Sequence, residues 1–214
     1  MKITVLCTDH RHPVNSYLRH WQKEMQAQGH EVELAHDVTG LKGGEILFLV
    51  SCSRVIQKAE RAQYKAVLVL HASSLPKGRG WSPHIWAILE GACEVEVCLL
   101  AAEDPVDSGD VWLRQTFQLE GHELFPESNE TLFLTELSLM TQAVERTTEI
   151  KPEAQQGTPG PLLRRRIPED SRIDPHKTIA EQFDLLRVAD PIRYPAFMDF
   201  RGKRYWIKIE KAPK

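Results

Sequence analysis

Two short polar segments near the middle of the chain carry residue types that could move protons. An apolar run over 66–70 ends at His71, and a second apolar run ends near Ala102, shortly before Asp107. Each run predicts a buried strand that stops in a loop rich in glycine, proline and serine. Ligands of open α/β sheets bind at the carboxyl ends of strands, so we expect His71 and Asp107 to face one cleft. A histidine beside a carboxylate can accept and donate protons near neutral pH.

The same two segments resemble the folate-dependent formyltransferases. That family carries Asn-x-His, then Leu-Pro-x-x-Arg-Gly, and later (Leu/Val)-Asp-(Thr/Ser)-Gly-Asp. Here His71 is followed by Leu75-Pro76-Lys77-Gly78-Arg79-Gly80, and the later loop reads Val106-Asp107-Ser108-Gly109-Asp110. One position departs from the pattern, because Val69 stands where the family has asparagine. The resemblance implies that the chain is an enzyme that transfers a formyl group from 10-formyltetrahydrofolate, with His71 and Asp107 as its catalytic residues.

The chemistry of formyl transfer suits this pair. The acceptor amine must lose a proton, and the formyl oxygen becomes negative in a tetrahedral intermediate. His71 can accept the amine proton and then donate to the oxyanion, while Asp107 is expected to fix the tautomer of the imidazole and raise its basicity. Direct transfer requires neither a metal nor a covalent enzyme intermediate. Val69 offers no side-chain hydrogen bond. Either backbone amides or a nearby hydroxyl (the candidates are Ser51, Ser53, Ser73 and Ser74) replaces the family asparagine, or the protein is a folate-binding relative with little activity.

The folate is expected between the loops that follow the apolar runs 45–50 and 94–101, where backbone groups can read the edge of a pterin. The residues expected to bind it are Leu49, Val50, Ser51, Cys52, Ser53, Leu100, Ala102, Glu103, Asp104 and Pro105. A nicotinamide cofactor is disfavoured, because the first strand-to-helix turn, residues 7–13, contains no glycine.

Within the family, the segment 166–170 resembles formyltransferases that act on amino sugars and on methionyl-tRNA. The segments 78–86 and 193–197 resemble enzymes that formylate nucleotide-linked 4-amino-4,6-dideoxy sugars, including those on the pseudaminic acid route to surface polysaccharides. The residues expected to bind such a substrate are Arg11, Lys77, Arg79, Gly80 and Trp81. The arginines at 164–166 suggest phosphate binding, but arginines beside a linker are expected to be solvated surface. Glycinamide ribonucleotide formylation is the alternative reaction, although a glycine-rich loop is missing from the first turn. A non-catalytic folate- or sugar-nucleotide-binding protein is the alternative class, favoured by Val69.

The composition of the whole chain argues against some classes of binding partner. The formal net charge of −3 does not indicate a nucleic-acid or membrane partner. The methionyl-tRNA enzymes are disfavoured for this reason, and because only about forty residues follow the segment 166–170 where those enzymes carry a barrel domain. No apolar run is long enough to span a membrane, and the first six residues are too short for a secretory signal. A cytoplasmic protein with reduced cysteines is expected.

The predicted elements alternate along the first 150 residues. Strands are expected over 3–7, 31–35, 45–50, 66–70, 94–101 and 111–118, with helices over about 13–28, 54–64, 82–91 and 130–146. This alternation predicts an α/β fold, a Rossmann-like, mostly parallel twisted sheet with helices on both faces. Prolines and glycines over 152–161 predict a linker, which divides the chain into a catalytic domain, 1–150, and a small extension, 151–214. The extension is expected to hold a helix over 178–188 and a hairpin over 196–209, whose free edge could support a homodimer.

Overall fold

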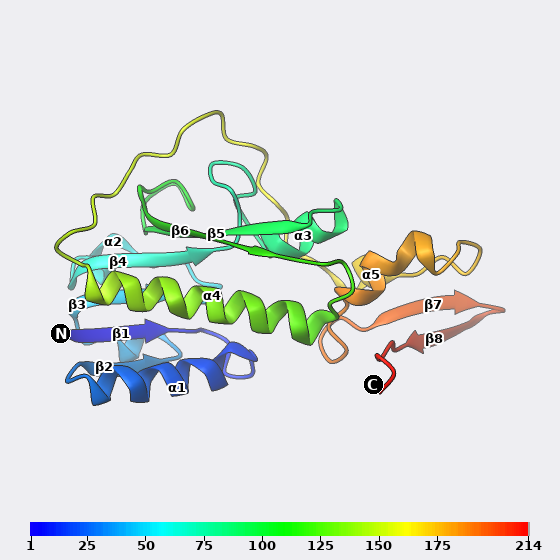
Figure 1. Cartoon of the computed structure of the whole chain (residues 1–214), viewed down its shortest axis with the longest axis horizontal. Helices are drawn as coiled ribbons and strands as arrows, with labels where there is room; N and C mark the ends of the chain where they lie inside the picture. The colour runs from blue at the N-terminus through cyan, green and yellow to red at the C-terminus, as the bar shows by residue number, and fades with distance from the viewer. Residues whose placement is uncertain (214) are drawn as a thin grey trace.

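A six-stranded twisted sheet forms the centre of the molecule in the computed structural model, which describes residues 1–213 (Figure 1). Its strands are β1 (Lys2–Leu6), β2 (Glu31–Ala35), β3 (Gly44–Leu49), β4 (Tyr64–His71), β5 (Glu94–Ala101) and β6 (Val111–Gln118). They lie in the order β2-β1-β3-β4-β5-β6. The first four run parallel, whereas β5 pairs antiparallel with both β4 and β6. The predicted mostly parallel, Rossmann-like α/β fold is confirmed.

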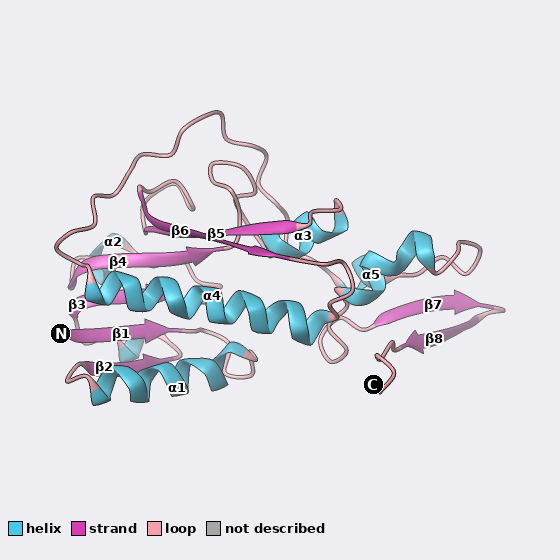
Figure 2. Ribbon diagram, viewed as in Figure 1, coloured by secondary structure: helices cyan, strands magenta, loops and turns pink. Residues whose placement is uncertain are grey.

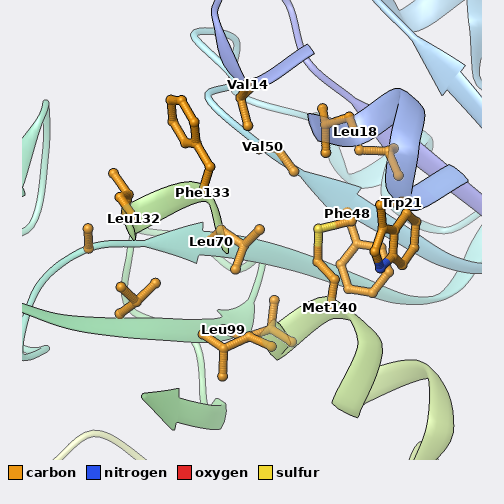
Figure 3. Close-up of a cluster of buried hydrophobic side chains, with 14 of the residues drawn as sticks. Val14, Leu18, Trp21, Phe48, Val50, Leu70, Leu99, Leu132, Phe133 and Met140 are labelled. Carbon is orange, nitrogen blue, oxygen red and sulfur yellow. The ribbon is translucent and has the colours of Figure 1, made fainter. Parts of the chain in front are cut away.

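One face of the sheet is covered by α1 (Val14–Ala27), α3 (Pro83–Leu89) and α4 (Phe125–Glu145). The rings of Trp21 and Phe48 pack edge to face, with their centroids 5.9 Å apart (Figure 3). The indole N–H of Trp21 donates to the Thr141 hydroxyl of α4 at 2.9 Å. Met140 and Leu70 belong to the same cluster. On the opposite face, a smaller cluster packs under the 3₁₀ turn Val38–Gly40 and the chain that leads into α2 (Lys58–Arg61).

Two predicted helices begin at other residues in the structure, each for a local reason, whereas α3 begins at Pro83 as predicted but without the expected side-chain cap. The helix expected over 54–64 is only α2, because the carboxylate of Glu60 accepts the N–H of Gln57 at 2.7 Å and starts the helix there. In the same way Glu127 accepts the N–H of Leu124 at 2.8 Å, so α4 begins earlier than the expected residue 130. Ser82 does not cap α3 with its side chain, and its φ of 48° is left-handed.

The chain beyond α4 runs along the molecule before it forms regular elements (Figures 1 and 2). The predicted linker is irregular but tied down, since the backbones of Glu153 and Val111 exchange two hydrogen bonds of 2.8 and 2.9 Å. Leu163 accepts from the N–H of Trp81 and donates to the carbonyl of Arg79. The division of the chain at residue 150 stays a prediction.

The extension contains a 3₁₀ turn (Pro168–Ser171), a second 3₁₀ turn (Ala180–Gln182) that continues into α5 (Phe183–Arg187), and the hairpin of β7 (Ala196–Phe200) and β8 (Lys203–Ile207). The hairpin projects away from the main sheet (Figure 1) and turns, as predicted, at Arg201 and Gly202, both with positive φ. The thiols of Cys7 and Cys98 are buried and free. Within residues 1–213 no helix combines the length and apolar character needed to cross a membrane.

Candidate active site

The carboxyl end of β4 and the loop between β5 and β6 bring His71 and Asp107 together. The Nδ1 atom of His71 lies 3.7 Å from Oδ1 of Asp107, and both side chains are more than nine-tenths buried. Both line a cavity of about 590 Å³, as does Val69, two residues before the histidine. The expected meeting of a histidine and a carboxylate in one cleft is therefore the geometry that the structure shows.

The loop 75–80 holds both side chains through its backbone. The carbonyl of Gly78 accepts a hydrogen bond from Nε2 of His71 at 2.9 Å, and the N–H of Gly80 donates to Oδ2 of Asp107 at 2.9 Å. A carbonyl can only accept, so Nε2 carries a hydrogen and the neutral imidazole has its lone pair on Nδ1. Gly78, rather than Asp107 as expected, therefore makes the contact that sets the tautomer. The separation of 3.7 Å is too long for a hydrogen bond, so Asp107 acts on Nδ1 through its charge.

Two positions in these loops require glycine. Gly80 has a φ of +110°, and a Cβ there would lie 2.4 Å from the carbonyl oxygen of Leu163. A Cβ at Gly109 would lie 2.1 Å from the carbonyl oxygen of Ala101. The side-chain amide of Gln155 donates to the carbonyls of Asp107 and Gly109 at 3.0 and 2.9 Å. The linker thus fixes the Asp107 loop from outside.

Six of the ten residues expected to bind folate line the cavity: Leu49, Ser51, Cys52, Ser53, Ala102 and Glu103. The other four lie outside the lining. Val50 and Leu100 are fully buried in the core, because their side chains point into the packed faces of the sheet. Pro105 is exposed, and Asp104 forms an ion pair with Arg61.

Of the residues expected to bind the acceptor, some line the cavity and others do not. Gly80 and Trp81 line the cavity, whereas Arg11, Lys77 and Arg79 do not. Of the serines proposed to replace the family asparagine, Ser51 and Ser53 line the cavity, and Ser53 already bonds the hydroxyl of Thr8 at 3.0 Å. Ser73 and Ser74 are outside the lining, and the Ser73 hydroxyl donates to the carbonyl of Lys77.

The expectation that all of the arginines 164–166 are solvated surface was wrong. Arg166 is only 6% exposed and lines the cavity. Arg165 also lines it, with its guanidinium 5.0 Å from the ring centroid of Trp81. Arg164 is exposed and pairs with Asp170. Arg166 alone of the three is buried, and Leu163, three residues earlier, is hydrogen-bonded to Arg79 and Trp81, a contact with no local sequence signal.

Several polar residues that line the cavity were not predicted from the sequence. Asn129 and Glu136 lie on the inner face of α4, and His12 and His84 come from the starts of α1 and α3. Burial raises the pKa of the Glu136 carboxyl to about 8. Burial, with a contribution from the charge of Arg193, lowers the pKa of His12 to about 4. For Glu136 the sequence did contain a signal, because this acid lies on the apolar face of an amphipathic helix, four residues before Met140.

Replacing Gly80 by alanine is expected to lower the free energy of unfolding by at least about 2 kcal/mol, because the new Cβ clashes with Leu163 in a left-handed backbone. The shift of Asp107 should also change the NMR signals of the His71 ring. Gly91→Ala is the matched control, since Gly91 has a φ of +86° but nothing within 4 Å of its added Cβ. Equal effects of the two variants on stability and on the His71 signals would contradict the inference that the contact of Gly80 with Leu163 holds Asp107 in place.

Replacing Glu136 by glutamine is expected to change how stability depends on pH. The folded carboxyl keeps its proton up to a pKa of about 8, while the unfolded carboxyl loses it near the ordinary 4.5. The wild-type protein therefore loses stability as pH rises through this window, and the glutamine variant does not. The free energy of unfolding of Glu136→Gln relative to wild type should rise from pH 4.5 to 8, by about 1.4 kcal/mol for each unit by which burial raises the pKa. Urea titrations at pH 5 and 8.5 measure this difference, and a constant difference would contradict it.

Comparison with known proteins places the chain in a family. The family model described as formyl transferase matches residues 6–143. A methionyl-tRNA formyltransferase from Desulfotalea psychrophila is 35% identical over 148 residues, which cover 63% of this chain and 42% of the relative. The corresponding protein from Fusobacterium nucleatum is 30% identical and covers 67% of this chain and 47% of the relative. The chain spans about half the length of the curated relatives it matches.

Solved structures of low sequence identity share the fold. A methionyl-tRNA formyltransferase from Clostridium thermocellum superposes with a TM-score of 0.80 at 19% identity, over 100% of this chain and 94% of that one. A likely sugar N-formyltransferase from Mycobacterium tuberculosis gives 0.78 at 17% identity, over 100% and 98% of the two chains. HypX from Aquifex aeolicus in complex with tetrahydrofolic acid gives 0.78 at 21% identity, over 98% and 37%. Because the family model spans more than half of the sequence and includes both His71 and Asp107, this chain belongs to the formyl transferase family.

Proposed function

We propose that this protein is an N-formyltransferase that moves a formyl group from 10-formyltetrahydrofolate to the primary amine of a nucleotide-linked amino sugar. The observation that carries the proposal is the buried pair of His71 and Asp107 in the wall of one large cavity. Family membership supports formyl transfer. The shared fold of a HypX protein bound to tetrahydrofolic acid and of sugar N-formyltransferases supports the folate donor and the sugar acceptor.

His71 supplies the proton transfers that this reaction needs. Its Nδ1 lone pair accepts the proton that the acceptor amine loses as the nitrogen bonds to the formyl carbon. The carboxylate of Asp107, 3.7 Å away, stabilises the resulting imidazolium. The same Nδ1–H then returns the proton to the folate nitrogen as the old carbon–nitrogen bond breaks, so the histidine ends neutral. The bond from Nε2 to Gly78 keeps the ring in place throughout.

The folate side of the cavity has a suitable mixture of groups. A pterin ring needs apolar walls and polar groups at its edge. Leu49 and Val69 supply apolar surface, while Ser51, Ser53 and Glu103 supply hydroxyl and carboxylate groups. We assign this half of the cavity to the donor, which supplies the formyl group when bound.

Methionyl-tRNA is the second candidate acceptor, because curated relatives 30–35% identical to this chain are named methionyl-tRNA formyltransferases. A panel of acceptors separates the possibilities. Transfer of labelled formyl from 10-formyltetrahydrofolate to UDP-4-amino-4,6-dideoxy-hexose would support the proposal. Transfer only to methionyl-tRNA or only to glycinamide ribonucleotide would replace the sugar by that acceptor, and binding without any transfer would favour a non-catalytic role.

The variant His71→Gln is expected to lose on the order of 10³-fold in kcat, because the amide can reach the Gly78 carbonyl but cannot accept a proton. Asp107→Asn should lose on the order of 10²-fold, since the imidazolium is no longer stabilised by a charge. The initial rate of formyl transfer measures both. Circular dichroism and tetrahydrofolate binding serve as controls for folding, and a His71→Gln rate within tenfold of wild type would exclude His71 as the base.

A further inference from the structure

Two ionisable side chains in the cavity wall are more than nine-tenths buried, and each has a buried polar atom without a hydrogen-bond partner among residues 1–213. Glu136 and Arg166 are each 6% exposed, and both line the cavity. In the described part of the chain, Oε2 of Glu136 and Nε of Arg166 have no hydrogen-bond partner. A buried polar group left unpaired costs free energy, so such groups require an explanation other than stability. Neither residue takes part in the proton transfers assigned above to His71.

Glu136 stands at one end of a wall made by α4. Asn129 lines the cavity two helical turns earlier, about 10 Å along the axis, and Leu132 and Phe133 line it between them. The wall is therefore polar at both ends and apolar in the middle. A sugar ring has the matching pattern, with hydroxyl groups at its edge and C–H groups on its faces. Because the Glu136 carboxyl has a pKa of about 8, it is mostly protonated at neutral pH and can both donate and accept, as a hydroxyl does.

Arg166 brings a positive charge to the lining from the chain beyond α4. Among the described residues, its guanidinium makes one side-chain hydrogen bond, from Nη2 to the Ser171 hydroxyl at 3.3 Å. The nearby carboxylates are engaged, Asp170 with Arg164 and Asp190 with Arg193. Within residues 1–213 no carboxylate lies within ion-pair distance of its guanidinium. A buried guanidinium with unused donors is complementary to a phosphate.

We propose that Glu136 and Arg166 form the acceptor subsite, in which Arg166 binds a phosphate group and Glu136 hydrogen-bonds a hydroxyl group of the amine-bearing ring. The acceptor class is therefore a phosphorylated, polyhydroxylated primary amine. This inference rests on the proposed function and deepens it, because it names the residues that select the acceptor.

The test uses the full chain with substitutions that separate the two contacts. Glu136→Leu removes the carboxyl, Glu136→Gln keeps a donor and an acceptor, and Arg166→Met removes the charge. Thr135→Val is the control on α4, because its hydroxyl bonds the carbonyl of Thr131 and it lies outside the lining. Arg146→Met is the control for charge, since that arginine is exposed and pairs with Glu149.

NMR titration gives Kd for four probes: UDP-4-amino-4,6-dideoxy-hexose, the free 4-amino-4,6-dideoxy-hexose, glycinamide ribonucleotide and tetrahydrofolate. Glu136→Leu should weaken both sugar probes at least tenfold, and Glu136→Gln less than threefold. Arg166→Met should weaken the two phosphorylated probes at least tenfold and leave the free sugar within twofold. Tetrahydrofolate affinity should stay unchanged in every variant, and the two controls should match wild type.

Three results would overturn the inference: unchanged sugar affinity in Glu136→Leu, equal loss for free and phosphorylated sugar in Arg166→Met, or no binding of any phosphorylated amine by the wild-type protein. Thermal unfolding tests a merely structural role, which predicts that Glu136→Leu lowers Tm, whereas removal of an unpaired buried carboxyl should raise it or leave it unchanged.

Two further outcomes separate the subsite from the proposed reaction. If wild type transfers formyl to methionyl-tRNA and both Glu136→Leu and Arg166→Met keep the wild-type KM for it, the subsite fails while formyl transfer stands. If the Kd pattern holds without any transfer, the proposed reaction fails while the subsite stands.

Discussion

The positions of the His71 and Asp107 side chains depend on one short backbone segment, residues 78–80. The carbonyl of Gly78 accepts a hydrogen bond from His71, and the N–H of Gly80 donates one to Asp107. Because the two glycines are only two residues apart, one short loop holds both side chains next to each other. Backbone groups make good supports because they cannot change rotamer. Gly80 is itself held by Leu163 from the irregular chain beyond α4. Three distant parts of the sequence therefore have to be in place before the histidine and the aspartate face each other correctly.

The extension contributes directly to the cavity. Arg165, Arg166 and Tyr194 lie in its lining beside residues of the first 150. The half of the cavity that we propose for the folate is lined by residues at the carboxyl ends of β3, β4 and β5, which is where open α/β sheets bind ligands. The opposite half is built by α4 and the extension. With donor and acceptor placed as we propose, different parts of the chain surround each of them, so acceptor preference can change without altering the sheet.

Much of the sheet could be predicted because its signals are local. The strands β2, β5 and β6 have the predicted bounds, since alternating or continuous apolar runs stop at turn residues on both sides. The meeting of His71 and Asp107 followed from their places at strand ends. By contrast, the tautomer contact from Gly78 and the burial of Arg166 depend on the path of the linker, which has no periodic pattern. Glu136 was missed because a helix that is polar on one face hides a single acid among its apolar positions.

The linker is anchored at two points only a few residues apart. Gln155 bonds the Asp107 loop, and Leu163 bonds the loop 75–80, while residues 156–159 between them are exposed. Insertions in exposed segments are tolerated when the backbone on either side stays fixed. This stretch therefore offers a place where evolution can lengthen or shorten the chain near the reactive centre while both of its supports remain unaltered.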